Sequence, residues 1–172
     1  MKPINGFLKK TIFVALSIFI LSNVYSQDVD WSKQITATTD LQELRISCID
    51  GSGNLIVGGW FNGDLSFVGT IETLSSTNVV AFIAKYDENG SLLWANQVGA
   101  SSPTTVKVIK TDNYNNIYIV GEIAGSSEFT SQDLNNKTIT NTTGFDGFLA
   151  KYDPNGNLTY AINIAYGNGI GR

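Results

Sequence analysis

Residues 82–92 of this chain read FIAKYDENGSL and residues 148–158 read FLAKYDPNGNL, so one motif occurs twice at a spacing of 66 residues. A second motif also returns, because residues 50–59, DGSGNLIVGG, match residues 112–121, DNYNNIYIVG, at a spacing of 62 residues. Self-similarity at such a spacing is typical of propellers, solenoids and other repeat arrays. The chain is therefore predicted to contain one structural unit twice, with a longer loop in the second copy.

Each unit is predicted to contain four short antiparallel strands. β-branched and aromatic residues are frequent in both units, and no apolar pattern at helical spacing is long enough for a helix. Asn89-Gly90 and Asn155-Gly156 are typical of tight hairpin turns, because both residue types tolerate a positive φ. The strands are expected at residues 44–49, 54–61, 79–87 and 91–97 in unit one, and at residues 106–111, 116–122, 147–152 and 157–163 in unit two.

A longer polar segment lies between the second and third strands of each unit, at residues 62–78 and 124–144. These segments are rich in Ser, Thr, Asn and Gly, and the extra residues of unit two fall in the second of them. Insertions usually fall in surface loops. Both segments are therefore expected to be loops, each held by one aromatic residue, Phe67 in unit one and Phe129 in unit two.

A fourth strand also precedes the first complete unit. Residues 31–34, WSKQ, match the fourth-strand residues 94–97, WANQ, and 160–163, YAIN. The chain after the N-terminal segment is thus expected to open on a strand at about residues 29–37, followed by unit one at about 44–97 and unit two at about 106–164.

The N-terminus has the pattern of a secretory signal peptide. Lys2, Lys9 and Lys10 form a basic start, residues 12–21 form an apolar run, and the segment ends in the small residue Ser26. The apolar run is shorter than the roughly 20 residues that span a bilayer. Cleavage after Ser26 is predicted, which leaves residues 27–172 with no stable membrane span and a secreted or cell-surface location; an uncleaved signal anchor is the alternative.

Charge and cysteine content exclude several classes of protein. The net charge of the whole chain is −4, and removal of residues 1–26, which hold three lysines and no acid, leaves 8 basic against 15 acidic residues, or −7. Nucleic-acid binding needs clustered Lys and Arg, so no nucleic-acid partner is expected. Cys48 is the single cysteine. An intramolecular disulfide is therefore impossible, and Cys48 is interpreted as a small buried residue.

The repeated residues resemble the SBBP repeat, the β-propeller repeat of secreted bacterial proteins, over about residues 31–172. That family has a D-x-x-G-N turn, an apolar strand that ends near Gly, and an A-K-Y-D-x-N-G-x-L-x-W hairpin. The matching turn residues are Asp50, Gly53, Asn54, Asp112 and Asn116, and the matching hairpin residues are Ala84 to Asp87, Asn89, Gly90, Leu92, Trp94, Ala150 to Asp153, Asn155, Gly156 and Leu158.

Three positions depart from the family pattern. Asn115 replaces the Gly of the turn, Tyr160 stands where Trp is usual, and Val80 stands where the second repeat has Asp146. The resemblance implies tandem four-stranded antiparallel β-propeller blades after an N-terminal signal helix. Closed propellers have about four to eight blades, so about two repeats amount to an incomplete propeller, the N-terminal fragment of a longer protein.

The Asp-rich turns are the candidate site for a metal ion. Oxygen-bearing side chains alternate along residues 50–54, 87–91 and 153–157, as they do in calcium loops. Val98, Ile164 and Phe61 stand where an EF-hand has its bidentate Glu. Asp and Asn also favour tight turns by hydrogen-bonding to their own backbone. The structural role is favoured over weak calcium binding, and no metal or other cofactor is assigned.

Enzyme classes find little support in the sequence. The chain has no histidine, which removes the Ser-His triad and histidine metal sites. No glycine-rich phosphate loop precedes a helix. Paired carboxylates for glycoside hydrolysis remain conceivable, but the acids lie mostly in repeat-equivalent turns. Trp31, Trp60 and Trp94 are better explained as packing between repeats than as stacking platforms for sugars.

Two functional hypotheses follow. The first is a non-catalytic exported scaffold or binding module with a protein or glycan ligand, part of a longer secreted or cell-surface protein. The alternative is a fragment of a polysaccharide-acting enzyme whose catalytic residues lie outside this chain. Two units are expected to leave apolar faces open, with partly exposed Val57, Ile83, Ile119 and Leu149, so self-association through these faces is also expected.

Export with cleavage gives a first prediction. N-terminal sequencing of the protein released by producing cells should begin at Gln27, because the basic start, the apolar run and the small residue at position 26 together specify a signal-peptidase site. Recovery of the protein in the membrane fraction with Met1 at its N-terminus would contradict the prediction.

Overall fold

The computed structural model describes residues 31–39, 42–100 and 102–165, and the regular structure in these residues is entirely β-strand. The prediction of an all-β antiparallel fold is confirmed, because each strand pairing is antiparallel. The predicted signal helix lies outside the described residues. The strands are β1 (Ile35–Ala37), β2 (Gln42–Ile49), β3 (Leu55–Phe67), β4 (Thr73–Tyr86), β5 (Leu92–Val98), β6 (Thr104–Thr111), β7 (Ile117–Phe129), β8 (Lys137–Tyr152) and β9 (Leu158–Ala165).

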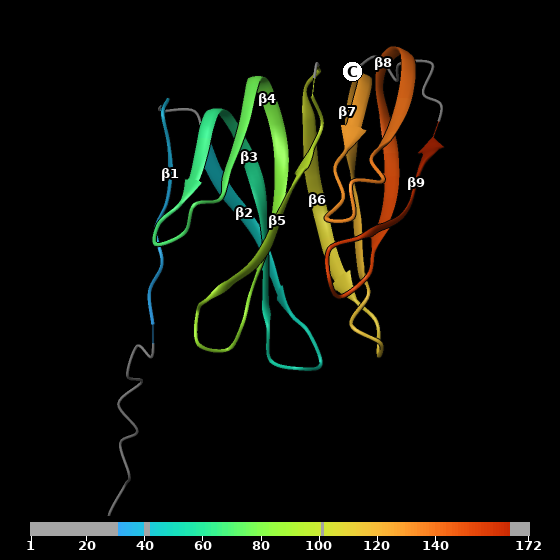
Figure 1. The fold of residues 1–172 in the computed structure, drawn as a ribbon. Coiled ribbons are helices and arrows are strands. Elements are labelled where there is room, and N and C mark those ends of the chain that lie inside the picture. The colour runs from blue at the N-terminus through green and yellow to red at the C-terminus, as the bar shows by residue number, and fades with distance from the viewer. Residues whose placement is uncertain (1–30, 40–41, 101, 166–172) are drawn as a thin grey trace, which may run out of the picture.

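Two four-stranded meanders make up the structure (Figure 1). Strands β2, β3, β4 and β5 pair in chain order to form unit one, and β6, β7, β8 and β9 form unit two. The pair Val98–Phe129 joins β5 to β7 across the two units, and β1 pairs with the end of β3. The assembly of such units into a propeller stays a prediction.

The two polar segments expected to be loops are strands for much of their length. β3 and β4 pair from Leu55 as far as Ser66, with a register shift between Phe61 and Gly63. β7 and β8 repeat this arrangement, with the shift between Ala124 and Ser126. The loop prediction is therefore wrong, because residues such as Thr73 and Ser75 face solvent on a strand pair whose other side carries buried residues such as Leu65. The predicted anchors Phe67 and Phe129 are both buried.

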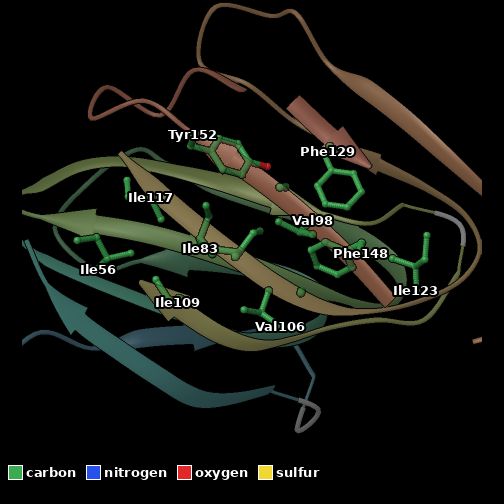
Figure 2. Packing of buried hydrophobic residues seen from close by; sticks show 14 of the residues in the cluster. Ile56, Ile83, Val98, Val106, Ile109, Ile117, Ile123, Phe129, Phe148 and Tyr152 are labelled. Atoms are coloured by element: carbon green, nitrogen blue, oxygen red, sulfur yellow. The ribbon is translucent and has the colours of Figure 1, made fainter. Parts of the chain in front are cut away.

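The larger hydrophobic core lies between the two units (Figure 2). Ile56, Ile83 and Val98 extend from unit one toward unit two, where Ile117 and Phe148 are among the side chains that meet them. Cys48 is half-buried at the edge of this core, and burial raises the pKa of its thiol. Packing between units thus excludes water from one face of each sheet.

A second core covers the other face of unit one. Val57, Phe82 and Tyr86 are buried there and pack with Trp31 and Ile35, which belong to the segment before unit one. The Trp31 ring stacks on Tyr86 with 6.1 Å between the ring centroids. The short segment that contains β1 therefore contributes to burying a face that would otherwise be open.

Because of this packing, three of the four residues that were expected to be partly exposed are buried. Ile83 and Ile119 are fully buried because they meet between the units, and Val57 is buried in the second core. Leu149 is half-buried, so it alone of the four residues has the expected partial exposure.

Truncation of one core residue tests the packing between and within the units. Phe148 is fully buried and contacts Phe129 edge-on, with 4.9 Å between the ring centroids. Phe148→Ala should lower the free energy of unfolding by about 3–5 kcal/mol, measured by urea denaturation. Ile71→Ala is the control, because Ile71 is 102% exposed. Equal midpoints for the two variants would contradict the proposed core.

Candidate interaction surface

The Asp residues of the repeated turns close their own turns. The Oδ1 atoms of Asp50, Asp87, Asp112 and Asp153 each accept hydrogen bonds from the backbone N–H groups two and four residues later, at 2.7 to 3.0 Å. Asn115, which replaces Gly53, has a φ of 62° and keeps the left-handed geometry of that position. This bonding supports the structural role of the turns. No group of three or more His, Cys, Asp or Glu side chains suited to a metal lies within the described residues.

A buried ion pair fixes one end of the contact between the units. The Lys85 Nζ atom lies 2.9 Å from Asp50 Oδ2, and the two side chains are only 3% and 0% exposed. Burial alone would raise the pKa of the Asp50 carboxyl, but hydrogen bonds from Asn54 and Lys85 outweigh burial and lower it. Lys85 Nζ also donates to the backbone oxygen of Pro154, at 3.1 Å. One ammonium group therefore links a turn of unit one to a turn of unit two.

Trp94 contacts the same turn of unit two. Its indole Nε1–H donates to the Pro154 oxygen at 3.1 Å, and its ring covers Gly156 so closely that a Cβ on Gly156 would lie 2.8 Å from it. Trp31 repeats this contact one unit earlier, because its Nε1–H donates to the Glu88 oxygen at 3.0 Å and its ring covers Gly90. The interpretation of these two Trp residues as packing between repeats agrees with this geometry.

The third Trp has a different environment. Trp60 is half-buried, and its Nε1–H donates to Glu43 Oε2 at 3.2 Å within unit one. It belongs to neither of the repeated contacts made by Trp31 and Trp94.

The end of β5 pairs with unit two, and the segment that contains β1 pairs with unit one in the same way. Thr130 N donates to Gln97 O at 3.1 Å, next to the pair Val98–Phe129. In the same way, Val68 N donates to Gln34 O at 3.1 Å, next to the pair Ile35–Phe67. β1 thus takes the place on unit one that the end of β5 takes on unit two.

These contacts define two faces for each unit. The front face packs on the segment or unit before it, and the rear face packs on the unit after it. In unit one the front face carries Val57, Val80, Phe82, Ala84 and Tyr86, and the rear face carries Ile46, Ile56, Ile83, Lys85, Trp94 and Val98.

The rear face of unit two is open in the part of the chain that the structure describes. Its strand register places Val108, Tyr118, Val120, Leu149, Lys151, Tyr160 and Ile162 on one side of the sheet, and Ile164 lies at a register shift between β8 and β9. Val108, Ile162 and Ile164 are 41%, 44% and 50% exposed. Adjacent exposed apolar side chains of this kind are typical of interaction sites. The sequence predicts open apolar faces on the two units, and of the four residues named for them Leu149 lies on this face.

Lys151 has a looser environment than its counterpart Lys85. Its Nζ atom lies 5.1 Å from the centre of the Tyr118 ring, and the Tyr118 hydroxyl donates to Asp112 Oδ2 at 3.2 Å. The hydrogen bond with Tyr118 is the main cause that raises the pKa of Lys151. The ammonium group therefore stays charged at the edge of the open face.

A groove lies beside the long hairpin of unit one. Its volume is about 590 Å³, and most of its lining residues carry a hydroxyl, amide or carboxylate group. Ser75 Oγ donates to Asp64 Oδ1 at 2.6 Å within it. The lining residues are Asn62, Gly63, Asp64, Ser75, Ser76, Thr77, Gln97 and Ala100. Nothing in the sequence indicates this groove, because the polar composition of residues 62–78 predicts a loop there.

Comparison with known proteins gives one distant similarity and no match to a protein-family model. The chain is 25% identical over 125 residues to an uncharacterised WD repeat-containing protein of Acanthamoeba polyphaga mimivirus. The match covers 66% of this chain and 9% of the viral protein, so the chain spans less than a tenth of that relative's length. The similarity supports a β-propeller-like repeat protein. No helix in the described residues is long and apolar enough to cross a membrane.

Removal of the Lys85 ammonium tests the link between the units. Lys85→Met should lower the free energy of unfolding by about 3–5 kcal/mol at neutral pH, because it leaves the buried Asp50 carboxylate without its cation. Lys151→Met is the matched control, since the same change at a partly exposed position should cost less than about 0.5 kcal/mol.

The loss of unfolding free energy caused by Lys85→Met should also depend on pH. Because the pKa of Asp50 is lowered in the folded state, the contribution of the pair is present above the usual Asp pKa of 3.8 and is lost as the pH falls through the folded value. Urea denaturation at pH 7 and in acid measures both effects. Equal losses for the two Met variants at pH 7 would contradict the role given to Lys85.

Proposed function

We propose that the chain is a non-catalytic scaffold or binding module built of SBBP-type propeller repeats, and that it is exported and acts in a secreted or cell-surface protein. The observation that carries the proposal is the open rear face of unit two. The front face of unit two packs against unit one, whereas its rear face presents exposed Val108, Ile162 and Ile164. The distant similarity to a WD repeat-containing protein supports a repeat-based module.

The repeated acids support a structural function over catalysis. The four turn Asp residues accept hydrogen bonds from their own turns, and Asp50 is also paired with Lys85. A general acid or base needs access to a substrate and a pKa suited to proton transfer near the working pH. Asp50 is buried and its pKa is lowered, and the chain has no histidine that could act as the general acid or base instead.

The chemistry of the open face favours a protein partner over a glycan. Its centre consists of aliphatic side chains, and Tyr118, Tyr160 and Lys151 lie among or beside them. Apolar surface of this kind gains free energy when another apolar surface excludes water from it. Glycans instead need dense hydrogen-bonding groups, which this chain concentrates in the groove around Asp64 and Ser75.

Photo-crosslinking at the open face tests the binding function. A photoreactive phenylalanine analogue at position 162, in the protein made by producing cells, should yield a discrete cross-linked product that mass spectrometry identifies. The same analogue at position 71 is the control, because Ile71 is exposed and belongs to the hairpin tip of unit one. No product at position 162, or the same products at both positions, would contradict a binding role for this face.

A further inference from the structure

We infer that the partner of the open face is a second copy of this chain, so that the rear face of unit two in one copy packs on the front face of unit one in the next. The inference rests on the proposed scaffold function and names the partner of its open face. A rear face already packs on a front face once inside the chain, where unit one meets unit two. The association therefore repeats a contact that the chain is known to form.

The front faces of the two units are nearly the same surface. Phe82, Ala84 and Tyr86 of unit one match Phe148, Ala150 and Tyr152 of unit two, and all six side chains are buried. Val57 matches Ile119 in the same way. A second copy therefore offers the type of surface that a rear face of this repeat packs on.

β9 carries counterparts of the groups that Trp31 and β1 place on unit one. Tyr160 matches Trp31, and Ile164 matches Ile35, in the alignment of the three fourth strands. β1 has only three residues, and its pairing partner is the end of β3 from Leu65 to Phe67. β9 from one copy can displace Trp31 and β1 of the next copy, with Ile164 replacing Ile35 on β3 and Tyr160 covering Gly90 in place of Trp31.

Charge also favours a second copy. Inside the chain, Lys85 donates to the backbone oxygen of the uncharged residue Pro154. The matching position in unit one is the exposed acid Glu88, and the lysine that would approach it from another copy is Lys151. An acidic turn thus faces a basic edge only in the contact between copies. Complementary charges of this kind set the orientation and register of a contact.

A contact between two different faces gives a ring where the rotation between copies closes, and an open series where it does not. Two copies with two units each supply the roughly four blades of the smallest closed propellers, so a closed dimer and larger species both agree with this contact. A symmetric contact between two open rear faces would instead leave the front face of unit one out of the contact. Dependence of association on Glu88, in the turn at the front of unit one, therefore distinguishes the two arrangements.

Sedimentation velocity of the purified chain from about 1 to 100 µM tests the inference, since these concentrations bracket contacts of moderate affinity. Species larger than the monomer should appear as the concentration rises. The double variant Ile162→Lys with Ile164→Lys should stay monomeric, whereas Ile71→Lys should associate as the unchanged chain does. A monomer at every concentration, or a double variant that still associates, would overturn the inference.

A charge exchange tests the register. Glu88→Lys and Lys151→Glu should each weaken association about tenfold, which corresponds to about 1.4 kcal/mol, and the two changes in one chain should restore it. Circular dichroism and urea denaturation show whether each variant is folded. Equal weakening in the single and combined variants would overturn the predicted approach of Lys151 to Glu88.

A further variant tests whether β1 competes with β9 for pairing with β3. Ile35→Ser weakens the pairing of β1 with Phe67, so it should strengthen association about tenfold if β1 competes with β9. Adding Ile162→Lys and Ile164→Lys should abolish that gain, and continued association of this combined variant would overturn the exchange. Cross-linking from position 162 to a different protein, with a monomeric chain, would overturn self-association and leave the binding function standing.

Discussion

A four-stranded sheet with apolar side chains on both faces cannot exclude water from both of them alone, and this constraint governs the whole molecule. Unit one buries its rear face against unit two, and its front face packs with Trp31 and the short strand β1. Unit two buries only its front face within the described residues, where Phe148 and Tyr152 are fully buried. Each unit is therefore stable only next to a neighbour, which is the physical basis of the repeat.

Polar groups give this apolar contact a fixed register. The Pro154 oxygen accepts hydrogen bonds from both Lys85 and Trp94, and Gly51 N donates to the Asn115 side chain at another point between the units. Because Gly156 has no side chain, the Trp94 ring can approach the backbone of the turn that contains Gly156. Apolar burial supplies most of the free energy, and the directional bonds select one alignment of the two sheets.

The open rear face of unit two has the strand register of the buried rear face of unit one, apart from one additional register shift between β8 and β9, but a different environment. Lys85 is enclosed by Asp50 and the next unit, whereas its counterpart Lys151 lies over Tyr118 at an open edge. Ile83 is fully buried, and its counterpart Leu149 is half-buried. Equivalent positions thus form core in one unit and more exposed surface in the other.

The sequence by itself determined the repeat, the antiparallel strands, the Asn-Gly turns and the match of Trp31 to Trp94, because these depend on local backbone preferences and on residue spacing. Only the tertiary structure decided that the largely polar residues 62–66 and 73–78 lengthen β3 and β4, since their ladder needs the partner strand to form. It also decided that Val57 is buried while Ile162 is exposed. Burial of an apolar strand residue depends on which surface packs against it, and the alternation of apolar and polar residues along one strand does not specify that surface.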